Sequence, residues 1–104
     1  MDKMKELESY LLVYAAKADF IIQEEEKKVI LTKISKDDYN AAKALYKSHN
    51  DIESINYITE LANELNLTEK DKTEMLNSIM HVFMADDEFD AREQQVNLFI
   101  QKIL

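Results

Sequence analysis

The apolar residues of this chain recur at the spacing of an α-helix along almost its whole length. In residues 3–18 they fall four, three and four positions apart and form one stripe, made of Leu7, Leu11, Tyr14 and Ala18. Five similar segments follow, beginning near Gln23 and behind Ser35, Asn50, Thr68 and Asp90. The pattern predicts an all-α fold, a compact single-domain bundle of about six helices joined by short connections.

Capping signals mark the boundaries of these helices. Ser35, Asn50 and Thr68 each stand three positions before an acidic residue, the spacing at which the two side chains satisfy the free backbone N–H groups of a helix start. Asn66 stands where the fourth helix is expected to end, and Asn is one of the few residues besides Gly that tolerates a positive φ.

The same periodicity predicts which side chains face the core. In the fourth helix the inward face is expected at Ile52, Ile55, Ile58 (or Thr59), Ala62 and Leu65. In the fifth helix it is expected at Met75, Leu76, Ile79, Val82 and Phe83. Most of the five tyrosines are expected to be half-buried, with their hydroxyl groups in water.

One sequence pattern occurs twice, at residues 18–29 and 85–96. Both stretches read Ala-Asp, followed by an apolar residue, a Glu and a Val at the same spacing. The copies lie 67 positions apart and align at Asp19 with Asp86, Ile22 with Phe89, Glu26 with Glu93 and Val29 with Val96. This register indicates an internal duplication, or one helix-turn-helix hairpin that is used twice.

Composition supports this fold class and narrows the function. The chain has 104 residues, 46% of them apolar, and contains no Gly, Pro or Cys, so thiolate metal sites are excluded. Its formal charge of −8, with bases spread along the sequence, disfavours nucleic-acid binding. No stretch approaches the roughly 20 apolar residues of a membrane span, and the first residues carry the wrong charge for a signal peptide. We expect a cytoplasmic protein that does not span a membrane.

The second copy of the pattern concentrates acidic residues. Asp86, Asp87, Glu88, Asp90 and Glu93 are five carboxylates within one short stretch, and their mutual repulsion favours a counter-ion or a basic partner. One interpretation is a divalent-cation site built from Asp86, Asp87, Asp90 and Glu93, together with Asp19 or Glu26 of the first copy. Ligands that are all oxygen atoms favour Ca²⁺, Mg²⁺ or Mn²⁺.

Such a site is not a standard EF-hand. The first two ligand positions of an EF-hand loop would hold Ala15 and Lys17 in one copy and Val82 and Met84 in the other, and none of these binds a hard cation.

The same acids also have a structural interpretation. Asp90 stands three residues before Glu93, as in a capping box, and Gln23 stands three before Glu26. Asp19 and Asp86 are placed to accept from backbone N–H groups in the turns. The spacing therefore leaves two alternatives open, capping alone and capping combined with cation binding.

The doubled pattern resembles the TerB-like family of tellurite-resistance operons, whose mark is A-D-G-x-[IL]-x-x-x-E occurring twice in a helical domain. The N-terminal domain of DjlA-type membrane co-chaperones is similar. Leu65 to Leu76 also fits the family, whereas Phe20 and Asp87 occupy its glycine positions. The resemblance implies a cation site that is better preserved in the second copy. It also implies a stress-response role, such as tellurite resistance, with membrane-associated or co-chaperone partners.

Catalytic residues are not indicated. His49 is expected at a helix end and His81 at the surface, while Ser35 and Thr68 are interpreted as caps. We therefore expect a non-catalytic binding module. The rival is a metal-free protein–protein adaptor in which the acidic hairpins are purely structural.

Overall fold

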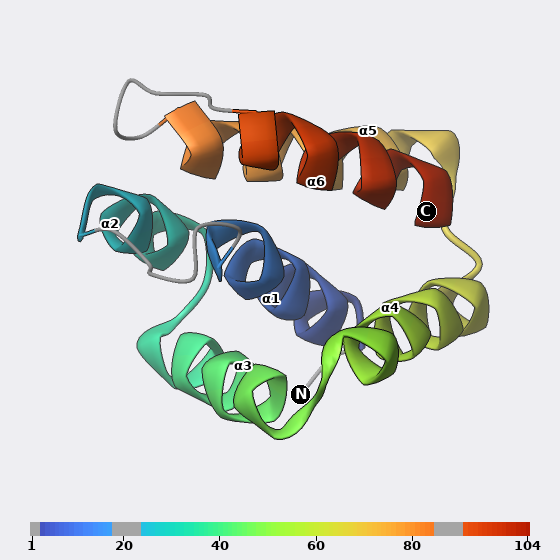
Figure 1. Cartoon of the computed structure of the whole chain (residues 1–104), viewed down its shortest axis with the longest axis horizontal. Coiled ribbons are helices and arrows are strands. Elements are labelled where there is room, and N and C mark those ends of the chain that lie inside the picture. The colour runs from blue at the N-terminus through green and yellow to red at the C-terminus, as the bar shows by residue number, and fades with distance from the viewer. Residues whose placement is uncertain (1–2, 18–23, 85–90) are drawn as a thin grey trace.

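A computed structural model describes residues 3–17, 24–84 and 91–104, with only the backbone described at 91–93, 96 and 103. Within these ranges the chain forms six α-helices and no strand. The helices are α1 (Lys3–Ala16), α2 (Glu24–Lys33), α3 (Lys36–Ser48), α4 (Asp51–Leu65), α5 (Glu69–Phe83) and α6 (Ala91–Ile103). The predicted all-α bundle of six helices is confirmed (Figure 1). None of the helices in the described ranges combines the length and the apolar character that crossing a membrane requires.

The predicted caps begin three of these helices. Asn50 Oδ1 accepts from the Glu53 backbone N–H at 2.8 Å, and Glu53 Oε1 accepts from the Asn50 N–H at 2.9 Å. Thr68 and Asp71 form the same reciprocal pair at 3.1 Å in both directions. Ser35 Oγ accepts from the backbone N–H three residues later at 3.0 Å. These boundaries are readable from the sequence because each depends on only four consecutive residues.

The end of α4 is set by Asn66, which adopts the left-handed conformation with φ 53° and ψ 56°. Replacing Asn66 by Ala is expected to lower the free energy of unfolding by about 1 kcal/mol, because a Cβ in this conformation meets the following carbonyl and Ala cannot compensate locally. The matched variant Asn66→Gly should have a free energy of unfolding at least about 1 kcal/mol higher than that of Asn66→Ala. Urea denaturation followed by circular dichroism measures both, and equal stability of the two variants would contradict the assignment.

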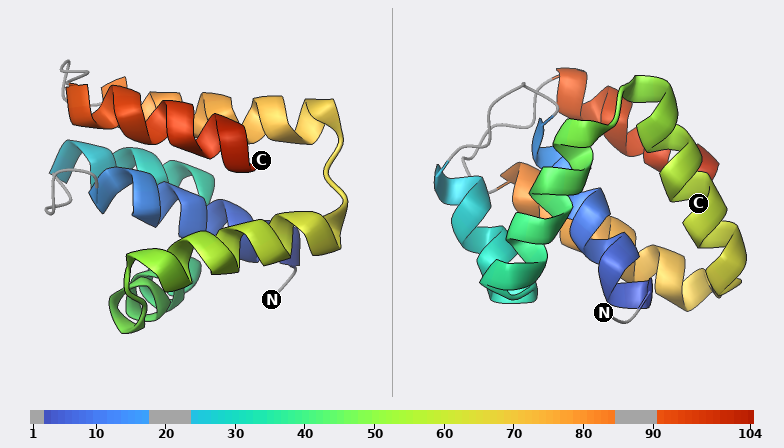
Figure 2. Two further views of the ribbon diagram at one scale, coloured as in Figure 1. Left: turned by 45° about the vertical axis from the view of Figure 1, so that its right-hand side comes forward. Right: turned by 90° about the horizontal axis from the view of Figure 1, so that it is seen from below.

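The central element is α1, which packs against α3, α4, α5 and α6 (Figures 1 and 2). Eight of its residues are buried: Leu7, Ser9, Tyr10, Leu11, Leu12, Val13, Ala15 and Ala16. The single apolar stripe predicted for this helix was too narrow, because neighbours surround α1 on several sides.

The doubled hairpin is visible in the helix bounds. Ala16 ends α1 and Phe83 ends α5, and these residues are 67 positions apart. Glu24 begins α2 and Ala91 begins α6, again 67 positions apart. The two hairpins share their register, and they pack on one another through α1, α2 and α5.

The predicted inward face of α4 was wrong at Ile52, which is 70% exposed. The buried residues of α4 are Ser54, Ile58, Leu61 and Ala62. Ile52 lies two residues before Ser54, about 200° around a helix of 3.6 residues per turn, and so points away from the core. The buried face of α4 includes the small polar Ser54, so the apolar residues alone do not mark it.

The prediction that most tyrosines are half-buried holds for three of the five, with Tyr10 and Tyr39 as exceptions. Tyr10 is 1% exposed and Tyr39 is 3% exposed, while Tyr14, Tyr46 and Tyr57 are half-buried as expected. Tyr10 belongs to the middle of α1, where the consecutive residues 9–13 are all buried.

Candidate functional site

Most of the predicted cation ligands lie outside the described part of the chain. Asp19, Asp86, Asp87 and Asp90 are not in the described ranges, and the side chain of Glu93 is also outside them. Glu26 is described: it is the third residue of α2 and is 2% exposed. Among the side chains that are described, no group of three or more His, Cys, Asp or Glu residues is placed to hold a metal.

The helix ends that flank the two acidic turns lie at one end of the molecule. In both views of Figure 2, the end of α1, the start of α2, the end of α5 and the start of α6 are found on the same side. The packing of α2 and α6 on α5 agrees with this arrangement. Buried Glu26 belongs to this end of the bundle.

A second cluster lies elsewhere, where α1, α3 and α4 meet. The Tyr10 ring lies 4.5 Å from the Tyr57 ring and 6.1 Å from the Tyr46 ring, measured between centroids. The imidazole of His49, at the end of α3, lies 5.9 Å from the Tyr10 ring. Aromatic pairs in tilted arrangements at these distances contribute stability beyond their buried area.

The Tyr10 hydroxyl is fully engaged by this cluster. It donates to Ser54 Oγ at 2.8 Å and lies 2.9 Å from His49 Nδ1. Because the hydroxyl has one proton, its donation to Ser54 requires that His49 Nδ1 carries the proton of the second hydrogen bond. Tyr10 therefore ties α1 to the end of α3 and to α4.

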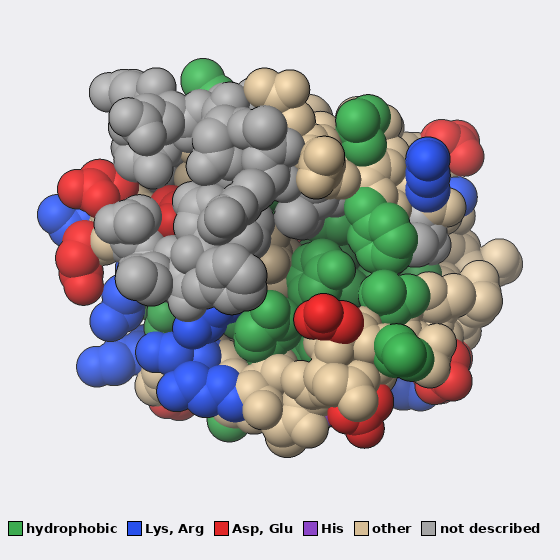
Figure 3. Space-filling view, viewed as in Figure 1, with side chains coloured by type: hydrophobic (Ala, Val, Ile, Leu, Met, Phe, Trp, Pro, Cys, Tyr) green, Lys and Arg blue, Asp and Glu red, His purple; other side chains and the backbone are tan. Residues whose placement is uncertain are grey.

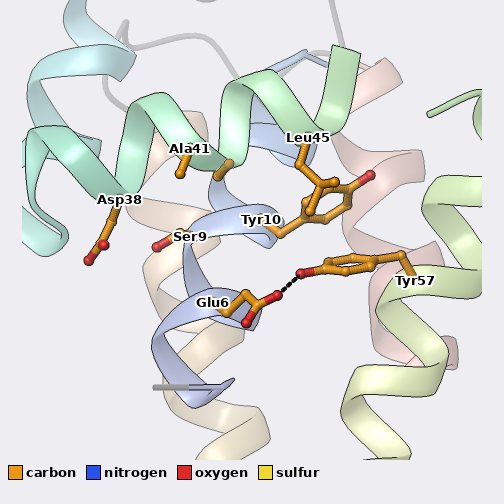
Figure 4. A pocket seen from close by; sticks show the side chains of 8 residues that line it. Glu6, Ser9, Tyr10, Asp38, Ala41, Leu45 and Tyr57 are labelled. Carbon is orange, nitrogen blue, oxygen red and sulfur yellow. Dashed lines mark hydrogen bonds between the residues drawn. The ribbon is translucent and has the colours of Figure 1, made fainter. Parts of the chain in front are cut away.

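Tyr57 of α4 holds a carboxylate of α1. Its hydroxyl donates to Glu6 Oε1 at 2.5 Å (Figure 4). Burial raises the pKa of Tyr57 well above its usual value, and the hydrogen bond to Glu6 and the charge of Glu6 raise it further. The phenol keeps its proton at neutral pH and directs Glu6 toward the junction of α1 and α4.

Beside this pair lies a cavity of about 110 Å³ between α1, α3 and α4. Its lining consists of Glu6, Ser9, Tyr10, Asp38, Ala41, Ala42, Leu45 and Tyr57 (Figure 4). Ser9 is 1% exposed, and its Oγ has no hydrogen-bond partner among the described residues. The arrangement combines apolar and aromatic walls with two carboxylates and one unused hydroxyl, which suits the binding of a small molecule or side chain.

Sequence reasoning did not single out Glu6, Ser9 or Asp38. Ser9 carries a weak signal, since it is a small polar residue directly before the apolar run from Tyr10 to Ala16. Asp38 was noticed only as the acid three residues after the Ser35 cap. Their common cavity depends on how α1 and α3 pack, which local spacing does not contain.

The histidines behave largely as expected. His81 is exposed, and its Nδ1 lies 3.0 Å from Lys33 Nζ of α2. His49 ends α3 as predicted, although its contact with buried Tyr10 was not foreseen.

Lysines lie closer together in space than in the sequence. On the face drawn in Figure 3, basic side chains gather over the region of α2 and α3. Lys27 and Lys43 belong to these two helices, and each places its Nζ 5.9 Å from the centre of the Tyr39 ring. This face offers positive charge in an otherwise acidic protein.

Comparison with protein-family models, with curated proteins and with solved structures finds no match to this chain.

Proposed function

We propose that this chain is a non-catalytic, cytoplasmic binding module of TerB-like type that serves a stress-response system such as tellurite resistance. In this proposal it holds a divalent cation, Ca²⁺, Mg²⁺ or Mn²⁺, at its acidic turns. The observation that carries the proposal is the common location of the four helix ends that flank the two turns (Figure 2). Among the proposed ligands, Glu26 is described, and it lies in the first turn of α2 at this end of the bundle.

Glu26 suits a role in such a site. It is buried in the first turn of α2, where the backbone N–H groups and the helix dipole favour a negative charge. A carboxylate held in this way is already ordered before a cation binds, so little side-chain entropy is lost on binding. Its counterpart in the second copy is Glu93, 67 positions later.

The second candidate function is a metal-free protein–protein adaptor, and a specific observation favours it. Two reciprocal capping boxes, Asn50 with Glu53 and Thr68 with Asp71, use an acid three residues after the cap with no ion involved. Asp90 and Glu93 have the same spacing. In that case the lysines of α2 and α3 form a surface for an acidic partner, which can itself be membrane-associated or part of a co-chaperone.

Carboxylate-to-amide substitution separates the two functions. In the first, Asp86→Asn combined with Asp90→Asn should raise the apparent Kd for Ca²⁺ by about tenfold or more, because two charged ligands are lost. Folding stability should change little, since Asn is as good a helix N-cap as Asp. The measurement is a backbone amide NMR titration of EDTA-treated protein with Ca²⁺, then Mg²⁺ and Mn²⁺.

The matched control is Asp37→Asn combined with Asp51→Asn. These exposed acids lie in the first turns of α3 and α4, so the control removes the same charge at helix starts elsewhere. Saturable shifts at residues 19–26 and 86–93 that survive in the control and disappear in the test variant support the cation site. The absence of shifts at millimolar ion refutes it and leaves the adaptor function, which pulldowns then address.

A further inference from the structure

The cavity between α1, α3 and α4 contains an unsatisfied polar atom. Ser9 is 1% exposed, and its Oγ has no hydrogen-bond partner among the described residues although it lines the open volume (Figure 4). A buried hydroxyl without a partner is costly, and native proteins satisfy nearly all such groups with protein, water or ligand. The Ser9 hydroxyl therefore requires a partner that occupies the cavity.

The charge around the cavity defines that partner. Glu6 lies one turn before Ser9 on α1, and Asp38 lies across the cavity on α3. The described salt bridges use other carboxylates, namely Glu64 with Lys3, Glu8 with Lys5 and Glu69 with Lys72. Among the described residues, Glu6 accepts a hydrogen bond from the neutral Tyr57 hydroxyl and forms none of these salt bridges. Two carboxylates at a partly apolar pocket, with no salt bridge to either among the described side chains, favour a positively charged occupant.

The walls and the size define its shape. Tyr10, Ala41, Ala42, Leu45 and Tyr57 supply apolar and aromatic surface. The cavity measures about 110 Å³, whereas a single water needs only roughly 10–15 Å³ of such volume. A short aliphatic stem fits this lining, and tyrosine ring faces attract ammonium groups.

We propose that this cavity binds a primary alkylammonium group, either a small free amine or the side chain of a partner's lysine. An ammonium has three donors and no acceptor, and Glu6, Ser9 and Asp38 provide three side-chain oxygen acceptors. The aliphatic stem lies against Ala41, Ala42 and Leu45. The site is separate from the acidic turns, because its lining comes from residues 6–10 of α1, residues 38–45 of α3 and Tyr57 of α4.

The test is an amide NMR titration of the full chain at pH 7 with n-butylammonium chloride, with n-butanol as the neutral analogue of similar shape. Saturable shifts are expected at residues 6–10, 38–45 and 57 with the ammonium and not with the alcohol. Ser9→Ala and Asp38→Asn should each weaken binding about tenfold, the loss typical of one hydrogen bond to a charged group. Asp37→Asn is the matched control for Asp38→Asn, since it removes the neighbouring exposed charge of the same helix turn and should leave the affinity unchanged.

A parallel titration with Nα-acetyl-lysine methylamide distinguishes the two sources. Tighter binding of this compound than of butylammonium identifies the lysine of a partner, and the reverse order identifies a free amine. The proposal is overturned if neither compound shifts these residues, in which case water occupies the cavity. It is also overturned if butanol is equivalent, or if the shifts centre on the other acidic hollow, lined by Met4, Glu8, Asp71, Glu74, Met75 and Ser78.

Discussion

Replacing Phe83 by Ala is expected to lower the free energy of unfolding by about 3–5 kcal/mol. Phe83 ends α5 and is fully buried in the core, where α5 packs on α1, α2 and α6. Removing the ring leaves a void that helices held by several neighbours cannot close. Domains of this size have about 5–15 kcal/mol of stability in total, so the variant should be marginally folded at 37 °C. Urea denaturation followed by circular dichroism measures the loss.

The control is the next residue. Met84 is 49% exposed, and Met84→Ala should change the free energy of unfolding by less than about 0.5 kcal/mol. If both variants lost the same small amount, the end of α5 would not be packed as described here.

Phe83 also shows how the two hairpins have diverged. Its counterpart in the first copy is Ala16, 67 positions earlier, and Ala16 is also buried. The backbone register of the hairpin is repeated, but the side chains at this pair of equivalent positions differ in volume. At this position the two copies therefore contribute unequally to one shared core.

Helix boundaries could be predicted from the sequence because their causes are local. Ser35, Asn50 and Thr68 cap their helices through residues three positions away, and Asn66 ends α4 through its own backbone conformation. The 67-residue register of the hairpins was equally visible, since it compares the chain with itself.

The cavity and its polar contacts could not be predicted in this way. Tyr10 finds its partners 39 and 44 positions away, at His49 and Ser54, and Tyr57 finds Glu6 51 positions away. Helical periodicity says which residues share a face but not which helices meet, and here α1 meets four others. The same limitation explains why Ile52 was expected to be buried although it is exposed. The spacing of apolar residues along α4 does not show which side of the helix faces α1.

Alkaline pH is expected to unfold this protein steeply. All five tyrosines have a raised pKa: Tyr10, Tyr14, Tyr39, Tyr46 and Tyr57. In each case the main cause is burial, which disfavours the phenolate, and nearby acidic groups add to it. The folded chain therefore keeps tyrosine protons at a pH where the unfolded chain, with tyrosine pKa values near 10, releases them.

The sign follows from proton linkage. Because the folded-state pKa is the higher one, this contribution to stability is complete below about pH 10 and is lost as the pH rises through the folded-state values. In this pH range a tyrosine keeps its proton in the folded chain and loses it in the unfolded chain. Each such tyrosine makes the free energy of unfolding fall by at most about 1.4 kcal/mol for every unit that the pH rises. Several tyrosines acting together should therefore exhaust the stability of a domain of this size within about one to two pH units above 10.

Urea denaturation at a series of pH values from 8 to 11, with tyrosinate absorbance recorded in parallel, tests this expectation. A chain with a net charge of −8 is also destabilised at high pH by general charge repulsion, and Tyr57→Phe separates the contribution of one tyrosine from that effect. The substitution should reduce the slope of the free energy of unfolding against pH, above pH 10, by up to about 1.4 kcal/mol per pH unit. Tyrosinate absorbance should rise together with the loss of helical signal, because burial holds the pKa of Tyr10 and Tyr57 above its usual value for as long as the helices stay packed, and the hydrogen bond to Glu6 adds to this at Tyr57. If instead the tyrosines ionised near pH 10 while the helices remained intact, the hydroxyl contacts that join α1 to α4 would be refuted.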